Sequence, residues 1–270
     1  MSIAPPPLCE HAVEALVQRS FRAECPSCGS FWDLDSLRQT VTYDASYPEQ
    51  RGHFDTRVGA LKVRTLERWL TRADIALASR VVCEVGFGGG ACLQFLAERA
   101  GRVIGLEASE ATLAHARDAG ISADLFHVAA LPRRLDVPVD LWIFQDSFEH
   151  IPDPAAFMAW VADVSADRAE ILLVAPRADS LSRRLMGRWW PHKLPDHQFH
   201  WSRAGLAAFM DRRRFSVRRS FFPLKYASPE MVLAHFRHKA GRPAPARRGA
   251  SLAIPINFGE MGLVFQRRSQ

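Results

Sequence analysis

A glycine-rich turn follows an apolar run in the first half of this chain. Residues 81–90 read VVCEVGFGGG, and residues 102–107, after a helix-like stretch, form a second apolar run that ends in a carboxylate. Glycine is needed where a backbone turns tightly and a ligand approaches it closely. Glu107 follows Gly86 by 21 positions, where its carboxylate can accept hydrogen bonds from both hydroxyls of a ribose. The pattern predicts a strand, helix and strand unit that binds a nucleoside.

Strand-like and helix-like segments alternate beyond this unit. Ser109 and Ser202 are placed to cap helices, and Asp153 precedes a proline at the first position of another helix. Residues 139–145 are apolar on both faces, as a central parallel strand should be. This alternation predicts an α/β fold with a mainly parallel, doubly wound sheet. We expect strands at 81–85, 102–107, 124–129, 139–145, 170–175, 215–223 and 261–267, and helices at 61–77, 91–100, 109–118, 153–164 and 202–213.

The composition is that of an ordinary globular protein. Hydrophobic residues make up 48% of the chain, which is enough for a buried core. No apolar run approaches the roughly 20 residues that a membrane-spanning helix needs, and residues 1–7 lack the features of a secretion signal. We therefore expect a cytoplasmic location and no membrane association. The odd number of cysteines, 5, does not favour a disulfide framework, so we expect reduced thiols or a metal site.

Two kinds of cofactor are compatible with the glycine turn. Gly86, Gly88 and Ala91 fit the dinucleotide pattern G-x-G-x-x-A, which alone is weak evidence. A dinucleotide carries a pyrophosphate, which favours a positive site, whereas S-adenosylmethionine carries an ammonium and a sulfonium, which favour a carboxylate. Glu84, two positions before Gly86, and the additional Gly90 therefore favour S-adenosylmethionine. A nicotinamide-dependent oxidoreductase is the alternative.

Three motifs lie along the chain. They are E-x-G-x-G-x-G at 84–90 together with Glu107, F-E-H-I-P-D-P at 148–154, and P-D-H-Q-F-H-W-S at 195–202. Together they resemble class I S-adenosylmethionine-dependent methyltransferases, and in particular the small-molecule branch that includes ubiquinone-biosynthesis-type enzymes. The resemblance extends from about Tyr43 to Arg268, and it implies a Rossmann-like fold with a seven-stranded sheet.

The resemblance assigns roles to residues around the turn. The turn would hold the methionine part of the cofactor, Glu107 would bind its ribose, and Ala108 would lie beside its adenine. Tyr47, in a segment similar to the lid of relatives, could bond the methionine carboxylate. Many relatives have an acidic residue near the adenine amine, but this chain has an apolar run at 128–132, so adenine would rely on backbone groups and apolar packing. The expected cofactor-binding residues are Tyr47, Glu84, Gly86, Gly88, Gly90, Glu107, Ala108, Gln145, Asp146 and Ser147.

The acceptor side of the reaction is marked by histidines. Methyl transfer from a sulfonium is an in-line displacement, so an enzyme mainly has to hold donor and acceptor in contact with water excluded. A hydroxyl acceptor also needs a base, and a positioned histidine contributes on the order of 100-fold to 10,000-fold. A carboxylate acceptor needs none. The candidate catalytic residues are His150, His197 and His200, each of which could instead serve packing or backbone hydrogen bonding.

Residues 177–201 form a long segment without a regular pattern, and such loops often carry function. Near its histidines it holds tryptophans and arginines, including Arg183 and Arg184, whose guanidinium groups pair well with carboxylate or phosphate. From Arg203 onward the chain has 14 Lys and Arg against 3 Asp and Glu, although a solvated basic surface is the plainer explanation of that excess. We expect a small-molecule or peptide acceptor that is anionic. Nucleic acid is less expected, because no RNA-binding module is present.

Cys25 and Cys28 have the C-x-x-C spacing of a metal knuckle, in which two thiolates hold one tetrahedral zinc. The nearby Cys9 and His11 are the only candidates to complete the site, although zinc ribbons usually use two C-x-x-C pairs. Several relatives carry an amino-terminal ribbon of this kind. The predicted metal ligands are thus Cys9, His11, Cys25 and Cys28, with unmetallated thiols as the alternative.

We expect three segments and one activity. Residues 1–40 would form a small cysteine module, 41–78 a lid and lead-in helix, and 79–270 the methyltransferase domain with an acceptor loop at 177–201. The expected reaction methylates an oxygen, in a hydroxyl or carboxylate, of a small metabolite or peptide in a biosynthetic pathway. Methylation of nitrogen or carbon is the alternative.

Overall fold

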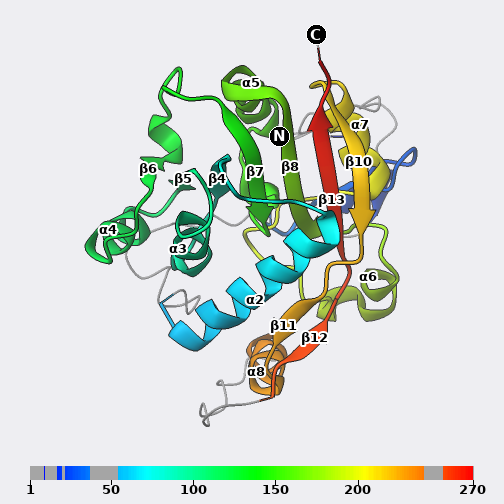
Figure 1. The fold of residues 1–270 in the computed structure, drawn as a ribbon. Coiled ribbons are helices and arrows are strands. Elements are labelled where there is room, and N and C mark those ends of the chain that lie inside the picture. The colour runs from blue at the N-terminus through cyan, green and yellow to red at the C-terminus, as the bar shows by residue number, and fades with distance from the viewer. Residues whose placement is uncertain (1–8, 10–16, 20–21, 37–53, 240–251, 270) are drawn as a thin grey trace.

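A seven-stranded sheet forms the centre of the protein in the computed structural model, which describes residues 9, 17–19, 22–36, 54–239 and 252–269. Its strands are β4 (Val81–Val85), β5 (Arg102–Glu107), β6 (Asp124–His127), β7 (Val139–Gln145), β8 (Ser165–Pro176), β10 (Phe215–Phe221) and β13 (Glu260–Arg267). They lie in the order β10-β13-β8-β7-β4-β5-β6 (Figure 1). Strands β4 to β8 are parallel to their neighbours within that group, and β13 and β10 add an antiparallel edge. The expected mainly parallel, Rossmann-like sheet is confirmed.

Helices cover both faces of this sheet. One face carries α2 (Thr56–Ala73), α3 (Ala91–Ala97) and α4 (Glu110–Asp118), and the other carries α5 (Pro154–Val164) and α7 (Arg203–Asp211). Successive side chains of a strand point to opposite faces. In β7, accordingly, Leu141 and Ile143 join the buried cluster under α2 and α3, whereas Trp142 and Phe144 join the cluster under α5 and α7. The sheet is therefore buried on both sides, as the doubly wound arrangement requires.

Helix α2 lies several residues earlier than the amphipathic pattern at 61–77 indicated. It begins after Asp55, whose side chain accepts a hydrogen bond from the Arg57 N–H. It ends at Ala73 because Asp74 takes a left-handed conformation, with φ at 58°, and its N–H bonds back to carbonyl groups of the last turn. Aspartate tolerates that conformation better than most residues. The expected helix is present, but both of its predicted boundaries were wrong.

A smaller sheet joins the amino-terminal segment to the segment 177–201. It contains β1 (Val17–Arg19), β2 (Arg22–Glu24), β3 (Phe31–Asp33) and β9 (Phe199–His200), which pair in that order and antiparallel. Trp32 of β3 packs edge-on against Phe199 of β9 at 4.7 Å, inside the cluster under α5 and α7. The cysteine-containing segment is thus packed onto the main fold.

The segment 177–201 is more regular than the sequence indicated. It contains α6 (Leu181–Met186), the 3₁₀ helix η5 (Gly187–Trp189) and strand β9. Ser180 caps α6 by accepting a hydrogen bond from the Arg183 N–H at 3.3 Å. Elements this short have little stability of their own, so their pattern is weak in sequence and their order comes from the pairing of β9 with β3.

Two further elements lie beside α2. Strands β11 (Lys225–Ala227) and β12 (Ile254–Ile256) form a two-stranded antiparallel sheet next to α8 (Pro229–Lys239), below α2 in Figure 1. The Trp69 indole donates to the Leu224 carbonyl at 3.0 Å, which holds the start of β11 against α2. The loop expected at 240–250 falls outside the described residues. In the described ranges no helix is both long enough and apolar enough to cross a membrane.

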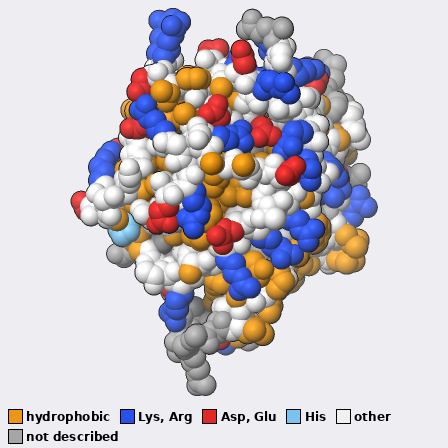
Figure 2. All heavy atoms as spheres, viewed as in Figure 1, with side chains coloured by type: hydrophobic (Ala, Val, Ile, Leu, Met, Phe, Trp, Pro, Cys, Tyr) orange, Lys and Arg blue, Asp and Glu red, His pale blue; other side chains and the backbone are white. Residues whose placement is uncertain are grey.

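Many basic residues of the carboxyl-terminal third are paired with acidic ones. Figure 2 shows Lys and Arg side chains gathered toward the right, over the side where Figure 1 places β10 and α6, with Asp and Glu among them. Among the ion pairs of this part of the chain, Arg218 of β10 contacts Glu170 at 2.8 Å, and Arg268 contacts Asp211 at 3.1 Å. The excess of positive charge is thereby partly compensated within the fold.

Candidate active site

The glycine turn crosses the carboxyl ends of β4, β5 and β7. Gly86, Gly88 and Gly90 have φ angles of 73°, 55° and 79°, in the left-handed region that favours glycine. A Cβ on Gly86 would lie 2.8 Å from the Cβ of Ser147, and one on Gly90 would lie 2.7 Å from a methyl carbon of Ile121. The left-handed conformation therefore favours glycine at all three positions, and the space beside Gly86 excludes a side chain. Gly86 is exposed, so a ligand can approach the backbone there, whereas Gly88 and Gly90 are buried.

Glu107, at the end of β5, is held against this turn. Its Oε2 accepts a hydrogen bond from the Gly88 N–H at 2.9 Å, and its Oε1 accepts from the N–H groups of Ala108 at 2.8 Å and Ser109 at 3.2 Å. The residue is only 7% exposed. The carboxylate expected to bind a ribose is thus fixed in orientation beside the turn.

Glu84, inside β4, carries a buried carboxyl group with one unused oxygen. Its Oε1 accepts a hydrogen bond from the Gln145 side chain at 2.8 Å, but Oε2 has no hydrogen-bond partner among the residues that the structure describes. Burial, only partly offset by that hydrogen bond, raises the pKa of Glu84 to about 8. A buried acceptor without a donor is costly, and a cationic ligand at the turn would relieve that cost. The residues present therefore fit the ammonium of S-adenosylmethionine better than a pyrophosphate.

Asp146 follows β7 and forms an ion pair with Lys225, a residue that the sequence alone does not mark as functional. The φ of Asp146 is 51°, and both of its carboxylate oxygens contact the Lys225 ammonium, at 2.7 Å and 2.6 Å. The same ammonium lies 2.9 Å from Oε1 of Glu260, and that oxygen also lies 3.1 Å from Nε2 of His192. No motif marks Lys225, which lies in the three-residue strand β11, or Glu260, the first residue of β13. Gln145 and Ser147 flank Asp146, as expected, at the end of β7.

The three predicted histidines are brought together by β9 and the short helix after β7. The ring of His150 lies 4.7 Å from that of His197, which lies 6.0 Å from that of His200. The His150 side chain is 20% exposed, compared with 5% for His197, and its Nδ1 lies 3.2 Å from the Asp196 carbonyl oxygen. His150 is thus the more accessible of these two rings.

His200 is 1% exposed. Burial, assisted by nearby cationic groups, lowers its pKa to about 3. The imidazole is therefore neutral throughout the physiological range, and proton exchange at this ring would be costly.

Glu149 lies beside these histidines. It belongs to the F-E-H-I-P-D-P motif, but the motif alone gives it no role. It is 6% exposed, and neither of its carboxyl oxygens finds a hydrogen bond within the described part of the chain. Burial, together with Asp146, raises its pKa. Glu149, His150 and His197 each offer a ligand atom within 4.8 Å of the others. A proton or a cation held by this cluster would offset the cost of burying it.

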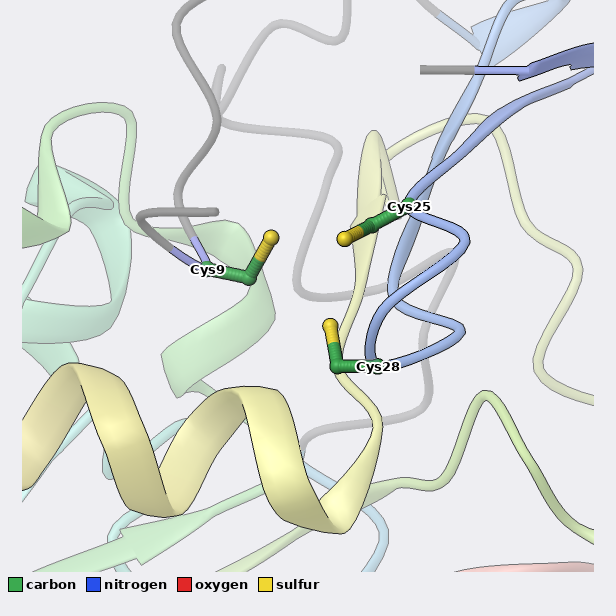
Figure 3. Close-up of side chains that lie close together, drawn as sticks. All are labelled: Cys9, Cys25 and Cys28. Atoms are coloured by element: carbon green, nitrogen blue, oxygen red, sulfur yellow. The ribbon is translucent and has the colours of Figure 1, made fainter. Parts of the chain in front are cut away.

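The sulfur atoms of Cys9, Cys25 and Cys28 point toward one another (Figure 3) and lie within 4.8 Å of each other. A hydrogen bond with Cys9, aided by Ser30 and opposed by burial, lowers the pKa of Cys28 to about 4. Thiolates at this spacing suit a tetrahedral metal. The other predicted ligand, His11, lies outside the described residues, as does the predicted cofactor-binding Tyr47.

Cys83 in β4 and Cys92 in α3 are buried among apolar residues.

The aromatic residues of the 177–201 segment differ in burial and contacts. Phe199 and Trp201 belong to the core cluster under α5 and α7, and Trp189 is 41% exposed. Trp190 is buried, and its indole donates to the Phe258 carbonyl at 2.7 Å.

Comparisons with known proteins agree with this geometry. The family model described as "Methyltransferase domain" matches residues 54–220. A "Ubiquinone biosynthesis O-methyltransferase" from Pseudomonas paraeruginosa is 34% identical over 86 residues, which cover 30% of this chain and 37% of that protein. One from Hahella chejuensis is 31% identical over 102 residues, covering 36% and 43%. The match thus spans less than half the length of these curated relatives.

Solved structures share the fold. Magnesium protoporphyrin IX methyltransferase from Synechocystis PCC 6803, with bound SAH, superposes with a TM-score of 0.52 at 17% identity, over 87% of this chain and 94% of that one. The YcgJ protein from Bacillus subtilis superposes with a TM-score of 0.53 at 14% identity, over 77% and 99%. At these identities the likeness concerns the fold.

Proposed function

This chain belongs to the methyltransferase-domain family, and on that premise we propose that it transfers the methyl group of S-adenosylmethionine to an oxygen atom of a small acceptor. The observation that carries the proposal is the Oε2 of Glu84, which finds no hydrogen-bond partner in the described part of the chain and lies beside a turn of three left-handed glycines. A carboxylate in that place favours a cationic ligand and disfavours the pyrophosphate of a dinucleotide. When bound, the cofactor supplies an electrophilic methyl group on a sulfonium.

The residues around the turn hold the cofactor in this proposal. The amino-acid part of the cofactor binds to the backbone of residues 86–90 and to the Glu84 carboxylate. Glu107 accepts hydrogen bonds from the ribose hydroxyls. Ala108 lies beside the adenine, and Gln145, Asp146 and Ser147 line the transfer region. Tyr47, in the proposed lid, bonds the methionine carboxylate. The partly buried ion pair of Lys225 with Asp146 keeps the end of β7 rigid, so that donor and acceptor meet in a fixed geometry.

His150 is the proposed general base for a hydroxyl acceptor. In the tautomer in which Nδ1 donates to the Asp196 carbonyl, Nε2 carries a lone pair that can take the hydroxyl proton. His197 packs against this ring and His200 lies one ring further away. Oxygen is the proposed target because the matched relatives from Pseudomonas paraeruginosa and Hahella chejuensis are named O-methyltransferases.

The cysteine cluster is proposed to hold a structural zinc. Cys9, Cys25 and Cys28 supply three thiolates, and His11 is the proposed fourth ligand. Because β2 and β3 flank the C-x-x-C turn, the metal would stabilise the small sheet that pairs with β9. Its role is therefore to fix the acceptor side of the site.

The test of the function is a search for the methylated product. The full chain is incubated with an extract of its host and with methyl-deuterated S-adenosylmethionine, and products are compared by mass spectrometry. We expect a labelled metabolite or peptide whose mass rises by one deuterated methyl group. A matched reaction with a Glu107→Ala variant should lack the product. If the active chain produces no labelled species that the variant lacks, the proposal fails.

A further inference from the structure

A cavity lies between the small sheet and the segment that contains α6 and η5. Its volume is about 280 Å³, and its lining includes residues of β2 and β3 as well as of the 177–201 segment. Ligand pockets for whole drug-sized molecules begin at roughly 300 Å³. The cavity therefore suits one chemical group of a ligand.

A neutral histidine, His200, lines the cavity. The His200 ring stacks on the Phe31 ring with the centroids 4.6 Å apart, and its centroid lies 5.3 Å from that of the Trp190 ring. All three residues line the cavity. The ring is 1% exposed, yet neither of its nitrogens has a hydrogen-bond partner from any described residue. A neutral imidazole has one N–H donor and one acceptor, and leaving such groups unpaired in a protein interior is unfavourable. A ligand in the cavity would satisfy the donor.

The walls of the cavity carry positive charge. The Arg183 guanidinium lies over the Phe31 ring at 5.2 Å, and that of Arg22 lies over it at 5.7 Å. The buried Nε of Arg183 has no hydrogen-bond partner within the described ranges. Arg184 and Lys193 also line the cavity.

The acidic groups near the cavity form ion pairs with Arg22 and Lys193. Glu24 pairs with Arg22 at 2.6 Å, and Asp33, which lines the cavity, lies 3.5 Å from Lys193. Lys193 also contacts Asp35 at 3.2 Å. None of these carboxylates forms an ion pair with Arg183 among the described contacts, so its guanidinium can bind a ligand, and a guanidinium pairs with two oxygens of a carboxylate or phosphate at once.

We propose that this cavity binds an oxyanion, a carboxylate or a phosphate, carried by the methyl acceptor, with the His200 N–H and the Arg183 guanidinium as its donors. This inference rests on the proposed methyltransferase function and names the acceptor class. The ring centroids of His200 and His197 lie 6.0 Å apart, and those of His197 and His150 lie 4.7 Å apart. In this proposal, an acceptor anchored in the cavity extends from there toward His150. Because Arg22 and Phe31 belong to β2 and β3, the cysteine-containing segment takes part in choosing the acceptor.

The test uses two probe anions on the full chain. Inorganic phosphate and benzoate are titrated separately by calorimetry at constant ionic strength, with neutral benzamide as the comparison. We expect saturable binding of at least one anion and none of benzamide, and the anion that binds more tightly identifies the source of the oxyanion. Arg183→Gln should weaken that binding roughly 10-fold or more. Arg188→Gln, an arginine of η5 outside the cavity lining, should leave it unchanged.

A second variant keeps the test decisive if Arg183→Gln loosens α6. His200→Phe retains a ring to stack on Phe31 but removes the N–H, and it should also weaken the anion. Binding of S-adenosylmethionine is measured on the same samples and should be unaffected by either variant. If the wild-type chain binds the cofactor but neither anion, or if both variants bind the anion like the wild type, the cavity proposal is overturned while the proposed function stands.

Discussion

The ammonium of Lys225 lies 2.6 Å and 2.7 Å from the two carboxylate oxygens of Asp146, so a strand late in the chain is tied to the end of β7 beside the glycine turn. The same ammonium contacts Glu260 at 2.9 Å. Burial tends to raise the pKa of Glu260, but the charges of Lys225 and His192 outweigh it and hold that pKa well below its usual range. One lysine therefore balances two carboxylates at the junction of β7, β11 and β13.

Removal of that lysine should destabilise the fold. Lys225→Met leaves the buried Glu260 with less compensation. Breaking a fully buried pair typically costs about 3–5 kcal/mol, and because the Lys225 side chain is 23% exposed, we expect a loss near the lower end of that range. The free energy of unfolding in urea measures this loss. Arg268→Met is the matched control, because its pair with Asp211 is about half exposed and should contribute less than about 1 kcal/mol. Equal losses in the two variants would contradict the role of Lys225 in compensating the buried Glu260.

Affinity for S-adenosylmethionine should rise with pH. Because burial raises the pKa of Glu84 to about 8, the group is mostly protonated at neutral pH, whereas a cationic ligand binds its ionised form. Binding should therefore release a proton, and affinity should increase up to about tenfold per pH unit between about pH 6 and about pH 8. Calorimetry in buffers of different ionisation enthalpy measures both quantities.

The same shift has a consequence for the cofactor-free protein. The pKa of Glu84 is higher in the folded chain than in the unfolded one, so its contribution to stability is complete below about pH 4 and is lost as the pH rises through about 8. Glu84→Gln should abolish the pH dependence of cofactor binding. Glu98→Gln, an exposed carboxylate at the end of α3, should retain it. A wild-type affinity that stays constant over this range would argue against Glu84 as the ammonium partner.

His150→Ala should lower kcat for a hydroxyl acceptor by a factor on the order of 100 to 10,000. Cofactor affinity should change little, since Glu84 and Glu107 are untouched. The low-pH limb of the rate profile, which reports the protonation of this base, should disappear in the variant. His115→Ala, on the exposed side of α4, serves as the control. An unchanged kcat in His150→Ala would mean that the acceptor needs no base or that another residue supplies it.

The cysteine cluster predicts a metal content of about one zinc per chain, measurable by elemental analysis. Cys25→Ser and Cys28→Ser should each lose most of that zinc and lower the melting temperature. Acceptor turnover should fall with it, because β3 pairs with β9, whereas cofactor binding should persist. Cys92→Ala, a buried cysteine in α3 outside the cluster, should keep the zinc. Less than about 0.3 zinc per wild-type chain would count against the site.

The parts of the structure that depend on local chemistry could be predicted from the sequence. The three glycines at 86, 88 and 90 adopt left-handed angles, and Asp153 and Ser202 cap α5 and α7. In each of these places, two or three neighbouring residues determine the conformation. The pattern of alternating apolar strands and capped helices was likewise sufficient to predict the central sheet.

The contacts between distant segments could not be predicted in this way. Pairing of Phe31 with His200 joins two strands of two or three residues that lie far apart in sequence. The contact of Lys225 with Asp146 spans 79 positions. Such contacts depend on the register of packed elements, which a local pattern does not encode. That residues of β2 and β3 line a cavity with the 177–201 segment therefore becomes visible only in the folded chain.

The most direct test of the account is a calorimetric titration of the chain with S-adenosylhomocysteine, beside a titration with NADH. We expect one saturable site for S-adenosylhomocysteine and none for NADH. Glu107→Ala should weaken binding by a factor of roughly 10 to 100, since hydrogen bonds to a charged group contribute about 1.5–3 kcal/mol, whereas Glu110→Ala, an exposed carboxylate in the first turn of α4, should bind like the wild type. Saturable binding of NADH, or an affinity for S-adenosylhomocysteine that Glu107→Ala leaves unchanged, would contradict the assignment of the glycine turn to a methyl donor.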